Sequence, residues 1–186
     1  DDMVEDIRKN IFAILNYYDR PFVFKNLNTG QRLRLIHKIY PDSKFIWIRR
    51  DLLDTIYSIL NGRRKLNIKE GEWWGIKPYN YKDLLKENEI DMVTKGVHQL
   101  EKQIYTDLKL FDKKQYSIID YEDLPELFSK QFSSLKVLGN IKKIENVKVE
   151  DCFKKGTSGN SINKETKEEI KTAINKLDWI FDEQQR

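Results

Sequence analysis

The chain has 186 residues, of which 39% are hydrophobic and 34% charged, so we expect one globular, water-soluble domain. Its net charge of +4 suits an anionic ligand but is too small to indicate nucleic-acid binding, and no apolar run approaches the roughly 20 residues that cross a bilayer. A single cysteine, Cys152, excludes an internal disulfide and favours a reducing compartment, so we expect a cytoplasmic protein.

The first part of the chain alternates predicted helices with short apolar runs. Apolar residues at helical spacing predict an amphipathic helix over 3–18. A run of large apolar residues predicts a strand over 22–25, and a second helical stripe follows over 33–40. The next strand is predicted over 44–49, and the helix after it can be capped by Asp51.

The second part begins with a long irregular stretch. Helical periodicity is lost over 61–88, and a loop of this length inside a compact domain is usually functional or disordered. The elements predicted after it are a helix over 91–110, a strand over 116–120, a helix over 125–138 and a terminal helix over 164–181. Strands that alternate with helices form βαβ units, so we predict an α/β fold with a helix-flanked parallel sheet, in a single domain over 1–186.

Basic residues stand at the ends of two predicted strands. Lys25 ends the first strand, Arg50 follows the second, and Ser58 comes eight residues after Arg50. Ligands of open α/β sheets bind beyond the carboxyl ends of the strands, so two cations and a hydroxyl there suggest an anionic, phosphate-bearing ligand. The alternative is that these basic residues merely end strands at the surface. Strand alternation sends Arg49 and Arg50 to opposite faces, and the spacing to Ser58 favours Arg50 for the site.

Several motifs together resemble a known enzyme family. Residues 20–60 read RPFVFKNLNTGQRLRLIHKIYPDSKFIWIRRDLLDTIYSIL, with Ser58 eight residues after Arg50. Residues 120–124 read DYEDL at a predicted strand end, and residues 72–78 read EWWGIKP. In this order and spacing, from about residue 20 to 165, the chain resembles sulfotransferases that use 3′-phosphoadenosine 5′-phosphosulfate. It is most similar to the branch that contains bacterial and tyrosylprotein sulfotransferases.

The resemblance implies a P-loop NTPase-like sulfotransferase fold. It also implies transfer of a sulfuryl group from this nucleotide, without a metal, to a hydroxyl or amine of a small molecule, carbohydrate or peptide. Lys25 matches the family lysine that contacts the bridging oxygen and the leaving phosphate, where a fixed cation stabilises developing charge. Arg50 and Ser58 match the residues that bind the 3′-phosphate, which a guanidinium can grip bidentately. Tyr121 matches the tyrosine near the nucleotide, and a buried structural tyrosine is the alternative.

Two further segments hold candidate residues whose interpretation stays open. Lys154, Lys155 and Gly156 form either a cofactor-binding loop whose backbone N–H groups approach phosphate oxygens or a solvated loop without a ligand. Trp73 and Trp74 lie in the irregular stretch, where they either wall the acceptor pocket or anchor the loop to the domain.

The chain departs from the family pattern at two points. The opening strand and its Pro-Lys-Ser-Gly-Thr-Thr phosphate loop have no counterpart, so we expect the chain to be the C-terminal portion of a longer protein. Leu27 stands where cytosolic members carry a catalytic histidine, and His37 and His98 fall in predicted helices. We therefore assign no general base.

Two rival functions are compatible with the sequence. Another nucleotide-dependent phosphoryl transferase would need Mg²⁺ carboxylates near a Walker-type loop, and the sequence has no such set. A non-catalytic anion-binding module could use a basic cluster such as Arg63, Arg64 and Lys65. The Lys-, Asn- and Ile-rich composition favours an AT-rich, bacterial genome, whereas the oligomeric state leaves no signal in the sequence.

Overall fold

A computed structural model of the chain describes residues 2–19, 23–125, 127 and 163–181. Within these residues the sheet has two parallel strands, β1 (Phe45–Arg49) and β2 (Tyr116–Asp120). Their register sets Phe45 opposite Tyr116 and Arg49 opposite Asp120. The predicted α/β class with a parallel sheet is confirmed.

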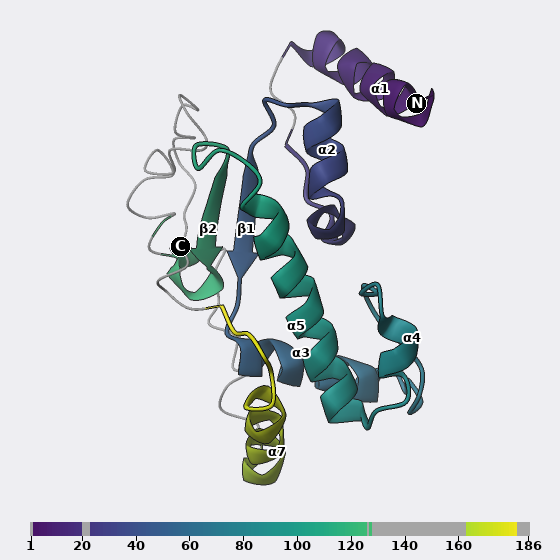
Figure 1. Cartoon of the computed structure of the whole chain (residues 1–186), viewed down its shortest axis with the longest axis vertical. Helices are drawn as coiled ribbons and strands as arrows, with labels where there is room; N and C mark the ends of the chain where they lie inside the picture. Colours follow the sequence, from purple (N-terminus) through teal and green to yellow (C-terminus); the bar gives the residue numbers. More distant parts are fainter. Residues whose placement is uncertain (1, 20–22, 126, 128–162, 182–186) are drawn as a thin grey trace.

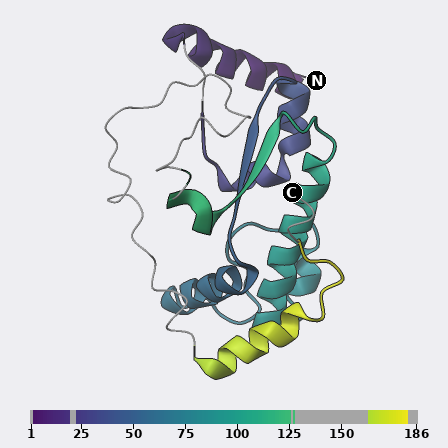
Figure 2. The same ribbon diagram turned by 90° about the vertical axis from the view of Figure 1, so that its left-hand side faces the viewer.

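Helices flank this small sheet. In chain order they are α1 (Asp2–Tyr18), the 3-10 helix η1 (Leu27–Gln31), α2 (Leu33–Ile39), α3 (Leu52–Lys65), α4 (Tyr81–Leu84), α5 (Glu89–Leu108), the 3-10 helix η2 (Tyr121–Asp123) and α7 (Lys164–Ile174). Figure 1 shows α3 beyond the carboxyl ends of the strands, and Figure 2 shows α2 and α5 on one side of them. Phe45 and Trp47 of β1 pack toward the core, whereas Ile46 and Ile48 are exposed.

The strand predicted over 22–25 is wrong for the residues that the structure describes. Residues 23–25 adopt no regular structure, and Val23 is exposed to solvent. An apolar run becomes a strand only where a neighbouring edge satisfies its backbone N–H and C=O groups. Among the described residues, the two strands of the sheet are paired with each other, and this segment is not one of them.

Two other predicted boundaries also need correction. The irregular stretch predicted over 61–88 begins with the last turn of α3 and contains the short helix α4. The terminal helix predicted over 164–181 ends at Ile174, and the chain then continues as a non-helical tail to Phe181. The helix predicted over 125–138 falls almost wholly outside the described residues.

The helix predicted over 3–18 is confirmed as α1, although it contributes no buried residue. Two polar contacts join it to the end of α2. Arg8 Nη2 donates to the carbonyl oxygen of Ile39 at 3.3 Å, and the Tyr40 hydroxyl donates to the carbonyl oxygen of Arg8 at 2.8 Å. These two contacts join α1 to the end of α2.

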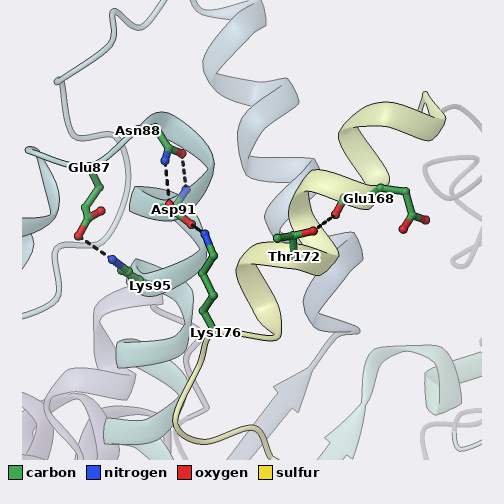
Figure 3. Close-up of polar contacts among 7 residues, drawn as sticks. All are labelled: Glu87, Asn88, Asp91, Lys95, Glu168, Thr172 and Lys176. Atoms are coloured by element: carbon green, nitrogen blue, oxygen red, sulfur yellow. Dashed lines mark hydrogen bonds and ion pairs between the residues drawn. The ribbon is translucent and has the colours of Figure 1, made fainter.

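Side chains fix the start of α5 and join it to the end of α7 (Figure 3). Asn88 caps α5, because its Oδ1 accepts a hydrogen bond from the backbone N–H of Asp91 at 2.9 Å. The Nδ2 of Asn88 donates to Asp91 Oδ2 at 2.7 Å. Lys176, just after α7, lies 3.7 Å from the other carboxylate oxygen of Asp91, and Lys95 pairs with Glu87 at 2.6 Å.

Two clusters of buried apolar side chains form the core. The first lies among α3, α4, α5 and α7 and consists of Leu52, Ile56, Leu60, Leu84, Met92, Val93, Val97 and Ile170. The second lies under the sheet and consists of Leu33, Phe45, Leu108, Phe111 and Tyr116. Since α5 contributes side chains to both clusters, it is the central element of the described structure.

Candidate functional site

The carboxyl ends of β1 and β2 form one rim of the sheet. The strands are parallel, and Arg49 lies opposite Asp120, so the next residues, Arg50 and Tyr121, leave the sheet side by side. The guanidinium carbon of Arg50 lies 5.8 Å from the centroid of the Tyr121 ring. Tyr121 is 47% exposed, so its ring is open to solvent rather than buried in the core.

Arg49 makes a different set of contacts from Arg50. Its guanidinium lies 3.6 Å from a carboxylate oxygen of Asp120 and 3.7 Å from one of Glu101, which lies on α5. It also lies over the ring of Phe181, 4.1 Å from the ring centroid. The two neighbouring arginines thus have separate roles, because Arg49 joins β1 to β2, α5 and the C-terminal tail whereas Arg50 lies at the rim with Tyr121.

The beginning of α3 brings further polar groups to the rim. Asp51 caps α3 as predicted, because its Oδ1 accepts a hydrogen bond from the backbone N–H of Asp54 at 2.9 Å. Arg50 Nη2 lies 3.5 Å from Asp54 Oδ2. Ser58 follows Asp54 by one turn, and residues four positions apart share a helix face. Asp54 and the exposed Ser58 therefore lie along one face of the first two turns of α3, and Arg50, just before the helix, pairs with Asp54.

Lys25 lies in the exposed segment that leads into η1. The 3-10 helix η1 packs closely on α5, because a Cβ atom at Gly30 would stand only 2.7 Å from Cδ1 of Ile104. Ile104 lies one turn after Glu101, the α5 residue that contacts Arg49. Helix α5 thus links the segment that follows Lys25 to the β1 end of the rim.

The two neighbouring tryptophans have different surroundings. Trp73 packs against the first hydrophobic cluster, its Nε1 donates to the carbonyl oxygen of Ile76 at 3.0 Å, and its ring touches Gly96 of α5 so closely that a Cβ there would stand at 2.7 Å. Trp74 lies over Gly62 of α3 and is 38% exposed. These contacts anchor the loop to α3 and α5, and a role of either ring in acceptor binding stays a prediction.

Arg63 does not belong to a surface cluster. Its side chain is only 1% exposed, and its Nε donates to Glu89 Oε1 at 2.7 Å. Its terminal nitrogens donate to the carbonyl oxygens of Glu72 at 2.8 Å and Lys69 at 3.1 Å. The idea that Arg63 binds anionic polymers together with Arg64 and Lys65 is therefore wrong for Arg63, because its guanidinium is used inside the protein to hold the loop after α3.

Burial shifts the pKa values of two groups on α5 in opposite directions. Burial raises the pKa of Glu101, and the nearby charge of Arg49 opposes that shift. Burial lowers the pKa of His98 below its ordinary value of 6.5, and the carboxylate of Asp178, 3.1 Å from its Nε2, only partly offsets this. Lys102 adds a second positive charge beside the same carboxylate and also lowers the pKa of His98.

The free energy of unfolding should fall as the pH drops below about 6.5 through the contribution of His98. The pKa of His98 is lower in the folded protein than in the unfolded chain. As the pH falls, the imidazole is therefore protonated first in the unfolded chain, and the neutral His98 contributes fully to stability only above the unfolded pKa. The urea concentration at the midpoint of unfolding should fall less between pH 7.5 and 5.5 in His98→Gln than in the wild-type protein, because the variant lacks the imidazole. Glu101 contributes in the opposite direction, because its raised pKa favours folding at lower pH, but it does so equally in both proteins. Parallel pH curves for wild type and variant would contradict the expectation.

The described residues show neither a metal cluster nor a membrane span. Within them, no group of three or more His, Cys, Asp or Glu side chains is arranged to hold a metal ion. None of the helices described is both long enough and apolar enough to cross a bilayer.

Comparison with known proteins identifies the family. A model of the sulfotransferase family matches residues 2–135, which is more than half of the chain. The chain belongs to the sulfotransferase family. Neither the curated proteins nor the solved structures contain a match to it. Sulfotransferase membership implies a P-loop-like fold, a transferase activity and an acceptor substrate.

The sulfotransferase match covers part of the predicted site. Lys25, Arg50, Ser58 and Tyr121 fall inside the matched range, as do both tryptophans. The predicted loop over 154–156 falls outside it and outside the described residues.

Two residues near the rim carry roles that the sequence prediction missed. Asp54 pairs with Arg50, a contact that the sequence analysis does not predict. The spacing of four residues between them could have indicated this pair. Phe181 was expected on the stripe of a terminal helix, whereas it lies in a tail and contacts Arg49. No local sequence pattern indicates that second contact.

Proposed function

We propose that this protein is a sulfotransferase that transfers a sulfuryl group from 3′-phosphoadenosine 5′-phosphosulfate to a hydroxyl or amine group. The observation that chiefly supports this is the juxtaposition of Arg50 and Tyr121, 5.8 Å apart, at the carboxyl rim of a parallel sheet. This rim is where open α/β sheets bind their ligands. The family match supports the same reaction class.

The rim residues suit the 3′-phosphate end of the nucleotide. The planar guanidinium of Arg50 can donate two parallel hydrogen bonds to phosphate oxygens, and Asp54 orients it from one side. The exposed hydroxyl of Ser58 can donate a third bond near the positive end of α3. The exposed ring of Tyr121 offers an apolar face for the adenine.

Lys25 is the proposed catalytic residue. Once bound, the donor supplies the sulfuryl group, and negative charge develops on the departing 5′-phosphate. The ammonium group of Lys25, on an exposed segment without regular structure, can approach the bridging oxygen and stabilise that charge. Since this charge is larger in the transition state than in the bound ground state, the lysine would raise the rate more than the affinity.

The acceptor and the cellular setting are proposed more broadly. The acceptor is a small molecule, carbohydrate or peptide, and Trp74, exposed beside α3, is the better candidate of the two tryptophans for contacting it. The basic loop over 154–156 is proposed to contact the nucleotide phosphates. The single cysteine supports a cytoplasmic setting.

Calorimetric titration of 3′-phosphoadenosine 5′-phosphate into the full-length protein tests the proposal. We expect saturable heat with one site per chain, unchanged by a magnesium chelator. Ser58→Ala should weaken binding by about tenfold, the equivalent of roughly 1.4 kcal/mol, because one hydrogen bond to a charged group is lost.

Three results would contradict the proposed function. The first is the absence of both binding heat and a thermal shift with the wild-type protein. The second is binding that requires magnesium, which would favour a phosphoryl transferase. Binding that disappears steeply with added salt and does not distinguish the nucleotide from other anions would instead favour a non-catalytic module.

A further inference from the structure

The tail after α7 returns to the sheet. Figure 1 shows it leading from the end of α7 toward the carboxyl ends of the strands. Lys102 Nζ holds Asp178 Oδ2 at 2.6 Å, and Trp179 stacks on Tyr105 with the ring centroids 5.6 Å apart. The tail is therefore attached along α5 before it reaches Phe181, which is 5% exposed.

Phe181 ends this path against the guanidinium of Arg49. The guanidinium carbon lies 4.1 Å from the centroid of the Phe181 ring and 5.6 Å from that of Trp47. The two rings meet edge to face with centroids 5.5 Å apart. A guanidinium over the face of an aromatic ring is attracted by the ring's negative face, and more strongly when water is excluded.

Two carboxylates and two aromatic rings surround the guanidinium of Arg49. The N···O distances to Asp120 and Glu101, 3.6 Å and 3.7 Å, are those of ion pairs without short hydrogen bonds. Its Nε is buried and has no hydrogen-bond partner among the described residues. The ring of Phe181 therefore holds this guanidinium together with the carboxylates of Glu101 and Asp120.

The position of Arg49 bears directly on the rim. Arg49 and Asp120 are register partners, and their side chains also pair across the two strands. Arg50 and Tyr121 each follow one member of that pair by a single residue. A shift of the Arg49–Asp120 pair would consequently change the distance between the two rim side chains.

We propose that Phe181 is a positioning residue for nucleotide binding, which it supports by holding Arg49 and thereby setting Arg50 against Tyr121. This inference rests on the proposed function, because it takes the rim as the nucleotide site. Phe181 itself does not touch the nucleotide. It links the C-terminal end of the described chain to the rim residues Arg50 and Tyr121, which come from its first two thirds.

Nucleotide affinity and side-chain NMR together test this role in the full-length protein. Phe181→Ala should weaken 3′-phosphoadenosine 5′-phosphate binding by about tenfold at a temperature where the variant is folded. Phe181→Tyr, which keeps the aromatic face, should bind within about twofold of wild type, whereas Phe181→Leu, which keeps an apolar side chain without the aromatic face, should be intermediate. Ile174→Ala is the matched control, because Ile174 packs on the first hydrophobic cluster, away from the rim.

The arginine Nε–H resonances report the geometry without a ligand. In Phe181→Ala the Arg49 signal should lose its ring-current shift and the Arg50 signal should also move, while Ile174→Ala leaves both in place. An unchanged Arg50 signal in Phe181→Ala, or Phe181→Ala affinity equal to that of Ile174→Ala, would overturn the inference. If the Arg50 signal moves but the wild-type protein binds no nucleotide, the positioning of Arg50 is supported and the proposed function is refuted.

Discussion

Replacing Arg63 with alanine is expected to lower the free energy of unfolding by about 3–5 kcal/mol, because the change deletes a buried side chain together with its ion pair to the partly exposed Glu89 and its bonds to two carbonyl oxygens. Arg63 is 1% exposed and donates to Glu89 and to the carbonyl oxygens of Lys69 and Glu72. The substitution leaves these acceptors without their donor and creates a cavity in the last turn of α3. Urea unfolding monitored by circular dichroism measures the change.

The neighbouring residue provides a matched control for this experiment. Arg64 has the same side chain but is exposed, so Arg64→Ala should change stability by less than about 0.5 kcal/mol. Arg63→Lys should be destabilised as well, because an ammonium group cannot reproduce the fork that reaches three separate acceptors. Equal effects of Arg63→Ala and Arg64→Ala would show that the buried network does not stabilise the loop.

Arg50→Ala is expected to weaken binding of 3′-phosphoadenosine 5′-phosphate by about 100-fold, or roughly 2.7 kcal/mol. The reason is that the proposed fork to the 3′-phosphate is lost while the carboxylate of Asp54 stays beside the site and repels the ligand. Arg50→Lys should lose at least about tenfold, since a lysine keeps the charge but not the bidentate geometry.

A second nucleotide makes this test specific for the 3′-phosphate. Adenosine 5′-monophosphate lacks that group, so its affinity should change by less than about threefold in Arg50→Ala. Comparing the two nucleotides in the two proteins isolates the interaction between the Arg50 side chain and the 3′-phosphate, as in a double-mutant cycle. Arg64→Ala again serves as the control for a general loss of positive charge. If both nucleotides lose affinity equally, Arg50 does not contact the 3′-phosphate.

Much of the fold follows from local sequence patterns. β1 and β2 are short apolar runs bounded by polar residues, and the periodic stripe of α3 starts directly after a capping aspartate. Each of these signals involves only residues that are close in the sequence, within one or two helical turns or within a single strand. This is why the alternation of strands and helices, and hence the parallel sheet, could be predicted.

The errors concern features that depend on distant residues. The apolar run over 22–25 looks like a strand locally, but its described residues do not pair with β1 or β2. In the sequence, Arg63 looks like one of three neighbouring surface cations. Its side chain is buried because it donates hydrogen bonds to carbonyl groups of the loop that follows α3, and the local sequence does not show these contacts. For the candidate site, the end of β1 and its spacing to Ser58 could be predicted, whereas the contact of Phe181 with Arg49 joins residues 132 positions apart and could not.

The position of α5 in both hydrophobic clusters has a consequence for how the molecule unfolds. Met92, Val93 and Val97 lie near its start, and Leu108 lies at its end, so this 20-residue rod of about 30 Å spans the described interior from one cluster to the other. Unfolding of α5 would expose side chains of both hydrophobic clusters at once. The sheet half and the helical half should therefore lose their structure in one cooperative step rather than as two independent subdomains.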